Sequence, residues 1–234
     1  MTTIANNLSA VRARIAAACA AAGRDPAGVR LLAVSKTFGP GAVQEAVAAG
    51  QQAFGENYLQ EATAKITTLA GLPGLEALEW HCIGPIQSNK TKLAAEHFAW
   101  VQSVDRLKIA ERLSDQRPAH LPPLNICLQV DIDGGANKSG LPPEEVEALA
   151  RAVAALPRLR LRGLMTIPEP ASDFAGQKAV HDRARVLFDR LVAAGLPLDT
   201  LSMGMSADLE AAIAGGSTMV RVGTAVFGGR PRAA

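Results

Sequence analysis

Basic and polar residues follow short apolar runs of the sequence, where buried strands would end. Lys36 follows the mostly apolar run 29–34, separated from it by one serine. An ammonium at the end of a buried strand loses part of its hydration, which favours the neutral amine that a Schiff base with an aldehyde requires. A lysine in such a place is also often a solvated charge, so this position alone makes Lys36 only a candidate for aldehyde capture.

Two later segments have the features of a phosphate site. Ser206 precedes a helical periodic run over 209–213 that begins with acidic residues, so we predict that Ser206 caps this helix. Gly204 would let the backbone approach a ligand closely, and Gly223 with Thr224 offers a second small notch with a hydroxyl. Taken singly, each segment could equally be a tight turn that uses glycine for its geometry.

The elements that must position these residues alternate between strand and helix. Amphipathic spacing predicts a helix from Ile4 to Cys19, and later helices over 41–49, 143–156 and 172–194. The strand candidates are 29–34, 52–54, 79–83, 99–102, 125–130, 160–165, 200–202 and 218–222. Eight strand-helix units in 234 residues favour an α/β fold of the (β/α)8 TIM barrel type over an open doubly wound sheet, with residues 1–234 as a single domain. Chemistry in such barrels lies at the C-terminal ends of the strands, where the residues above fall.

Composition excludes several classes of function. Lysine and arginine number 24 against 22 acidic residues, and this balance gives no basic patch for nucleic acid or an anionic membrane. Cys19, Cys82 and Cys127 form no disulfide-like pattern, and no apolar run is long enough to span a membrane, so we expect a cytoplasmic protein with reduced thiols. His81 and Cys82 would point to opposite sides of a strand, and no metal site is predicted.

Six motifs in order give the chain a strong resemblance to the pyridoxal-phosphate homeostasis family, whose fold is similar to the barrel domain of alanine racemase. The motifs are A-V-S-K-T (33–37), F-G-E-N-Y (54–58), W-H-C-I-G-P-I-Q-S-N-K (80–90), K-S-G (138–140), S-M-G-M-S-x-D (202–208) and V-R-V-G-T-A-V-F-G (220–228). The resemblance covers nearly the whole chain. It implies that pyridoxal 5'-phosphate, abbreviated PLP, is the cofactor and that Lys36 forms the Schiff base with it.

The resemblance also assigns the remaining cofactor-binding residues. It places Ser206, Gly223 and Thr224 around the phosphate, Arg221 near the pyridine nitrogen and Asn57 beside the ring. A cation beside the pyridine nitrogen disfavours its protonation and weakens the ring as an electron sink. We therefore expect a cofactor carrier with no catalytic residues, which binds, buffers or delivers PLP.

Two other functions remain as alternatives. In the first, the protein is a low-activity PLP-dependent racemase in which Lys36 is one base and His81 or Lys138 is the other. Alanine racemase has a similar arginine but takes a tyrosine base from a separate domain, whereas the only tyrosine here, Tyr58, lies in a different motif. In the second, the barrel is a phosphosugar-type enzyme without PLP.

If the protein is a PLP carrier, we expect it to be a monomer, with PLP-dependent apo-enzymes as candidate partners.

Overall fold

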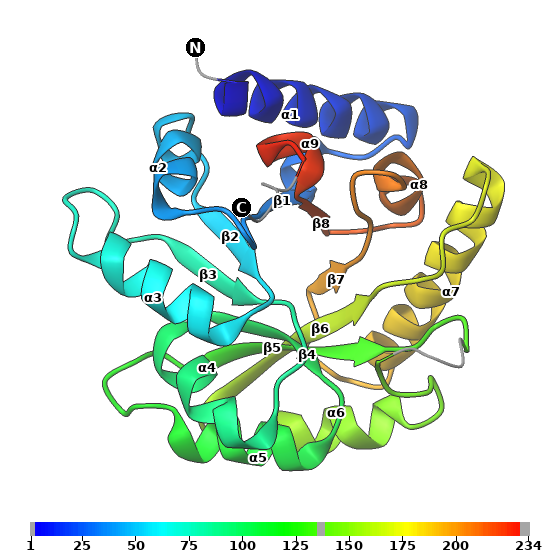
Figure 1. Cartoon of the computed structure of the whole chain (residues 1–234). Coiled ribbons are helices and arrows are strands. Elements are labelled where there is room, and N and C mark those ends of the chain that lie inside the picture. Colours follow the sequence, from blue (N-terminus) through cyan, green and yellow to red (C-terminus); the bar gives the residue numbers. More distant parts are fainter. Residues whose placement is uncertain (1–2, 135–138, 230–234) are drawn as a thin grey trace.

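The computed structural model describes residues 3–134 and 139–229, which form a closed barrel of eight parallel strands inside a ring of helices (Figure 1). The strands are β1 (Arg30–Val34), β2 (Ala53–Glu56), β3 (Glu79–Cys82), β4 (Trp100–Val104), β5 (Leu124–Val130), β6 (Leu159–Thr166), β7 (Thr200–Ser202) and β8 (Met219–Val222). The helices are α1 (Thr3–Ala21), α2 (Pro40–Ala48), α3 (Leu59–Ala70), α4 (Thr91–His97), α5 (Leu107–Gln116), α6 (Val146–Ala154), α7 (Phe174–Ala193), α8 (Leu209–Ala214) and α9 (Thr224–Phe227).

The barrel closes because the first and last strands pair with each other. Each strand is parallel to its neighbours, and the register between β1 and β8 runs from Arg30 opposite Met219 to Ala33 opposite Val222. This closure confirms the predicted (β/α)8 barrel and rules out an open sheet, in which β1 and β8 would not be neighbours. All C-terminal strand ends consequently meet at one end of the barrel.

The helices bury one apolar face against the outside of the barrel. Side chains of α1 such as Leu8, Val11 and Ile15 are buried in the main hydrophobic cluster, and α1 packs against α2, α8 and α9 (Figure 1). Helix α1 ends where expected: Gly23 takes the left-handed conformation at φ 64°, and the Arg24 N–H donates to the Cys19 carbonyl at 2.8 Å.

Three predicted helix starts are too early. Helix α7 begins at Phe174 rather than at residue 172. Helix α6 begins at Val146 rather than at residue 143, because the Glu145 N–H donates to the Pro142 carbonyl in a separate turn. Helix α8 begins at Leu209, and its cap position is Asp208, so the prediction that Ser206 is the cap is wrong. The Asp208 carbonyl accepts the first helical bond, from Ala212 N, and Ser206 lies in the turn before it.

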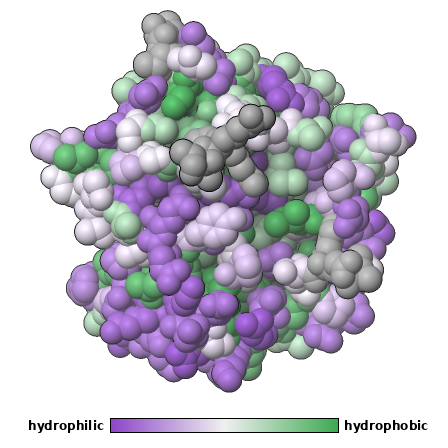
Figure 2. Space-filling model, viewed as in Figure 1, coloured by the Kyte–Doolittle hydropathy of each residue, from purple (hydrophilic) through white to green (hydrophobic). Residues whose placement is uncertain are grey.

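The surface is mixed in character. On the face seen in Figure 2, hydrophilic side chains predominate over α3, α4 and α5, with hydrophobic ones in scattered patches. Among the described residues, the helices are too short or too polar for any of them to traverse a lipid bilayer.

Candidate functional site

A cavity of about 300 Å³ opens at the C-terminal ends of the strands, and all six predicted site residues line it. They are Lys36, Asn57, Ser206, Arg221, Gly223 and Thr224. Four segments far apart in the sequence supply them: the loops after β1, β2 and β7, and β8 with the start of α9. Apolar Val34, Ile83 and Ile167 also line the cavity. The barrel therefore brings the six residues together around a space that suits one small molecule.

Lys36 is the second residue after the end of β1, between buried Ser35 and exposed Thr37, and is itself half-buried. The Ser35 carbonyl accepts a hydrogen bond from the Phe38 N–H at 3.1 Å, so the chain turns sharply at the lysine. This short turn holds the Lys36 side chain at the opening of the barrel. The sequence predicts an amine at this position, at the end of the first strand.

Arg221 is the charged residue on the floor of the cavity. Its side chain projects from β8 and only 4% of the residue is exposed. Nη1 donates to Ser202 Oγ and Nη2 donates to the Thr166 carbonyl, both at 2.8 Å. Burial lowers the pKa of Arg221 to about 10, so the guanidinium is still charged at neutral pH. The cavity therefore has a fixed positive charge at its base.

A chain of hydrogen bonds continues from Arg221 through the interior of the barrel. Ser202 Oγ donates to Gln102 Oε1 at 2.6 Å, and Gln102 Nε2 donates to His81 Nδ1 at 2.8 Å. Because His81 Nδ1 accepts this bond, the ring proton belongs on Nε2, which lies 2.5 Å from Glu79 Oε1. Sequence reasoning missed this chain, since its members are spaced over four strands and no local motif links them.

His81 is thus part of the barrel interior. It is fully buried, stacks on Trp100 with ring centroids 5.0 Å apart, and burial lowers its pKa. Cys82, the next residue, packs in the hydrophobic cluster on the other side of β3, as the alternation of a strand requires. Lys138, the other base considered for a racemase, lies outside the described residues.

The loop after β7 is held by Asp208. Its Oδ1 accepts the Met205 N–H at 2.6 Å, and its Oδ2 lies 2.9 Å from Nε2 of buried His181. Gly204 has φ 93°, and a Cβ there would overlap the Cβ of Ala212 in α8. The glycine is therefore needed for packing between this loop and α8.

Gly223 and Thr224, directly after β8, line the cavity beside β1. Gly223 precedes the short helix α9, whose first N–H groups have no acceptor within the helix. A Cβ at Gly223 would lie 3.3 Å from the Val34 carbonyl oxygen, so a larger residue would crowd the base of the cavity. The hydroxyls of Ser206 and Thr224 and these backbone donors together can hold an anionic group.

Asn57 contributes an unsatisfied polar atom. Its Oδ1 is buried and has no hydrogen-bond partner among the described residues. Gly84 fixes its position, because a Cβ at Gly84 would overlap the Asn57 carbonyl oxygen. Tyr58, the next residue, is 55% exposed and belongs to a neighbouring cavity on the surface. An unsatisfied buried acceptor beside an open cavity is typical of a ligand site.

Fold and site together define a barrel of the alanine racemase type. The family model "Alanine racemase, N-terminal domain" matches residues 6–231, so the chain belongs to this family. Within it, the chain is 64% identical over 230 residues to the pyridoxal phosphate homeostasis protein of Pseudomonas aeruginosa, covering 98% of this chain and 97% of that one. The protein of the same name from Escherichia coli is 55% identical to this chain, and the aligned region covers 98% of each of the two chains. The chain is thus a member of the pyridoxal phosphate homeostasis group of this family.

Solved structures agree with this membership. PipY of Synechococcus elongatus, whose structure has been determined with PLP bound and without it, is 39% identical with a TM-score of 0.83. That likeness covers 97% of this chain and all of PipY. Alanine racemase of Corynebacterium glutamicum is 19% identical to this chain, with a TM-score of 0.63. The likeness covers 59% of the racemase chain and shows a shared fold alone.

Proposed function

We propose that this chain binds PLP at the strand-end cavity and serves PLP homeostasis by holding and delivering the cofactor. The observation that carries the proposal is that one 300 Å³ cavity is lined by an amine, a buried guanidinium, two hydroxyls and a glycine at a helix start. PipY, a relative with the same fold, has a structure with PLP bound. The unsatisfied Asn57 Oδ1 and the charge of Arg221 both suit a polar, anionic ligand.

Each residue has a separate part in the proposal. Lys36 Nζ would bond covalently to the aldehyde carbon, and Ser206 and Thr224 would donate their hydroxyl protons to phosphate oxygens. Asn57 would position the ring, and Gly223 would leave room for the phosphate. When bound, PLP supplies an electrophilic aldehyde conjugated to a ring that can withdraw electrons.

Arg221 is the basis for proposing carriage with little or no turnover. A guanidinium beside the pyridine nitrogen keeps that nitrogen unprotonated and reduces the electron withdrawal that carbanion chemistry needs. The alternative base His81 is occupied by Gln102 and Glu79 inside the barrel. We therefore propose that bound PLP is stored and passed on to PLP-dependent apo-enzymes, by a monomeric single domain of residues 1–234 acting in the cytoplasm.

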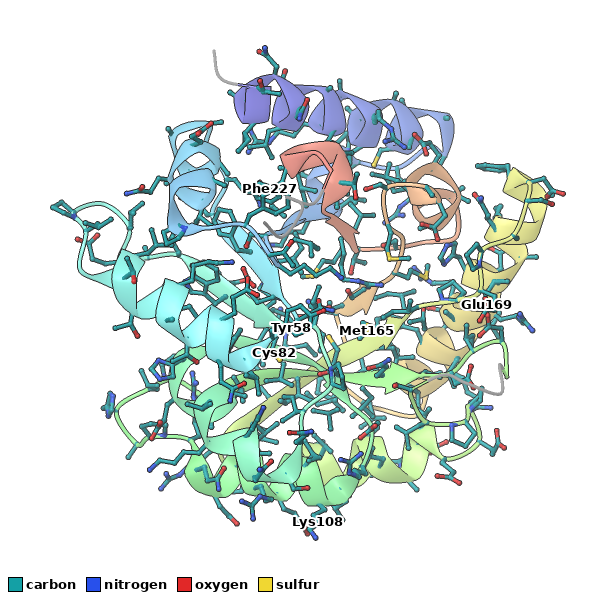
Figure 3. All side chains as sticks on the ribbon, viewed as in Figure 1. Tyr58, Cys82, Lys108, Met165, Glu169 and Phe227 are labelled. Carbon is teal, nitrogen blue, oxygen red and sulfur yellow. The ribbon has the colours of Figure 1, made fainter. Side chains whose placement is uncertain are left out.

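A spectroscopic titration tests the proposal. PLP is added to the purified protein, and the visible absorbance change and its retention on dialysis are measured for the wild type, Lys36→Ala and Lys108→Ala. Lys108 lies on the outer side of α5, well away from the centre of the barrel (Figure 3), and serves as the matched lysine control. The proposal expects the wild type and Lys108→Ala to retain the absorbance and Lys36→Ala to lose it. Equal retention by Lys36→Ala would refute the assignment.

The absence of turnover has its own test. The PLP-loaded protein is incubated with a panel of amino acids in deuterated water, and exchange of the α-proton is followed. A carrier leaves the α-proton in place, whereas a racemase of low activity exchanges it.

A further inference from the structure

The peptide groups on both sides of Lys36 are held by side chains of α3. Lys65 Nζ donates to the carbonyl oxygen of Ser35, the residue before Lys36, at 2.9 Å. Glu61 Oε1 accepts from the N–H of Thr37, the residue after it, at 2.8 Å. Glu61 and Lys65 stand one helical turn apart and their charged atoms are 3.5 Å apart. We refer to this pair as the α3 clamp.

The clamp is anchored by a buried carboxylate at the end of β2. Glu56 Oε1 accepts from Lys65 Nζ and from Ser35 Oγ, both at 2.6 Å. The side chains of Lys65 and Glu56 are 3% and 0% exposed. A buried ion pair is a poor source of stability but a strict geometric constraint, since neither charge can move without losing its partner. The pair therefore fixes where Lys65 meets the backbone of the Lys36 loop.

Thr37 shows that the loop is held in an unfavourable conformation. Its φ is 68°, and it is the only non-glycine among the described residues with a positive φ. A β-branched residue rarely adopts this conformation unless its surroundings impose it. The bond from the Thr37 N–H to Glu61 is the contact that can impose it. The direction in which the chain leaves Lys36 thus depends on α3.

The clamp residues stay apart from the proposed cofactor cavity. Glu61 and Lys65 line a separate groove of about 420 Å³, which also includes Thr37 and Phe38. They can therefore act on a ligand of the cavity only through the Lys36 loop. Ser206, Arg221 and Thr224 come from the loop after β7, from β8 and from α9, and none of them has a hydrogen bond to Glu61 or Lys65 among the described contacts.

We propose that Glu61 and Lys65 are positioning residues that aim the Lys36 amine at the aldehyde carbon, and that they govern covalent capture but not phosphate binding. The proposal rests on the proposed PLP function. In the capture step, the lone pair of neutral Nζ forms the bond to the aldehyde carbon, both amine protons are lost and the aldehyde oxygen leaves as water. The rate of such a step depends steeply on the placement of the nucleophile, because a misaligned amine must first reorient.

The test separates capture from binding. Glu61→Ala removes the acceptor for Thr37, and Glu61→Gln keeps an oxygen acceptor without the charge. Glu96→Ala, from the exposed Lys92–Glu96 pair of α4, is the control for loss of an i,i+4 ion pair. The rate of covalent capture of PLP is measured by stopped-flow absorbance. Affinity is measured with pyridoxine 5'-phosphate, whose alcohol in place of the aldehyde cannot react with an amine.

The clamp predicts that Glu61→Ala slows capture at least tenfold while its affinity for pyridoxine 5'-phosphate stays within twofold of wild type. Glu61→Gln should recover part of the rate, and Glu96→Ala should match wild type. An unchanged capture rate in Glu61→Ala overturns the clamp, as does an equal fall in rate and affinity, which would indicate general damage to the site. If the wild type itself captures no PLP, the proposed function fails and the clamp with it.

A second variant guards against misfolding of the first. Glu56→Gln with Lys65→Met removes both buried charges at once, so that no unpaired charge is left inside the protein. Its melting temperature and circular dichroism are compared with wild type. A folded double variant with slow capture and normal pyridoxine 5'-phosphate affinity supports the clamp, and one with a normal capture rate overturns it.

Discussion

The guanidinium of Arg221 donates a hydrogen bond to the hydroxyl of Ser202 at 2.8 Å. Arg221 is almost completely buried, and this acceptor is uncharged. Its other acceptor, the Thr166 carbonyl, is also neutral. Burial lowers the pKa of Arg221 and the charge of Asp208 raises it, but among the described residues no carboxylate forms an ion pair with the guanidinium, so an anionic or electron-rich ligand can stabilise it further. The arrangement therefore favours a ligand in the cavity above Arg221 over a purely structural role for this side chain.

Replacement of Arg221 by methionine tests that interpretation. Arg221→Met removes the charge and keeps much of the volume, so we expect the free protein to remain folded while PLP affinity falls at least tenfold. The measurement is the rise in melting temperature on adding saturating PLP, which reports binding to the native state. The same rise in variant and wild type would contradict a role for the charge in binding.

Loss of the Ser206 and Thr224 hydroxyls should weaken binding of the PLP phosphate. A hydrogen bond to a charged group contributes about 1.5–3 kcal/mol, so Ser206→Ala and Thr224→Ala should each weaken PLP binding by about tenfold or more. Competition by inorganic phosphate should weaken in parallel, because it uses the same donors. Equilibrium dialysis measures both effects. Unchanged affinity in the double variant would exclude the two hydroxyls from the phosphate site.

Gly84 should be intolerant of any side chain. In Gly84→Ala the new methyl would overlap the backbone of Asn57, and forced overpacking of this kind costs about 1–3 kcal/mol of stability. Because the shift moves Asn57, we also expect weaker PLP binding. Chemical denaturation and PLP titration of the variant check the two effects. Gly28→Ala, where a Cβ meets nothing within 4 Å, is the control.

Stability should fall in acid because of Glu79. Burial alone would raise the pKa of Glu79, but the hydrogen bond to His81 and the ion pair with Arg30 lower it to about 2 from an ordinary 4.5. A carboxyl with a lowered folded-state pKa stabilises the protein fully above 4.5, and this contribution is lost as the pH falls towards 2. We expect Glu79→Gln to lose less stability than wild type between pH 5 and about 3 in urea unfolding. Parallel curves would contradict this assignment.

The sequence predicts the barrel well because its strands carry strong local signals. Runs 29–34 and 125–130 are mostly apolar, with Arg30 as the one charged residue in them, as mostly buried strands should be. The structure confirms them as β1 and β5 within one residue. The six cofactor-binding candidates were found through strand ends and motif resemblance, and the closed barrel brings them to one cavity. Their individual roles towards PLP remain predictions.

The features that the sequence does not reveal depend on tertiary packing. Lys65 looks like an ordinary helix-surface lysine, and only the approach of α3 to the ends of β1 and β2 buries it beside Glu56. The positive φ of Thr37 follows from the same contact, since nothing in the identity of threonine favours it. Ser206 was misplaced as a helix cap for a related reason: Asp208, two residues later, competes for the same position and bonds to the Met205 N–H.

The central claim is that one amine, that of Lys36, forms the covalent bond to the cofactor. The most direct measurement is borohydride reduction of the PLP-loaded protein, followed by intact mass and peptide mapping. We predict a single phosphopyridoxyl group per chain, carried by the peptide that contains Lys36. An adduct distributed over other lysines, or the same yield in Lys36→Ala, would contradict the claim.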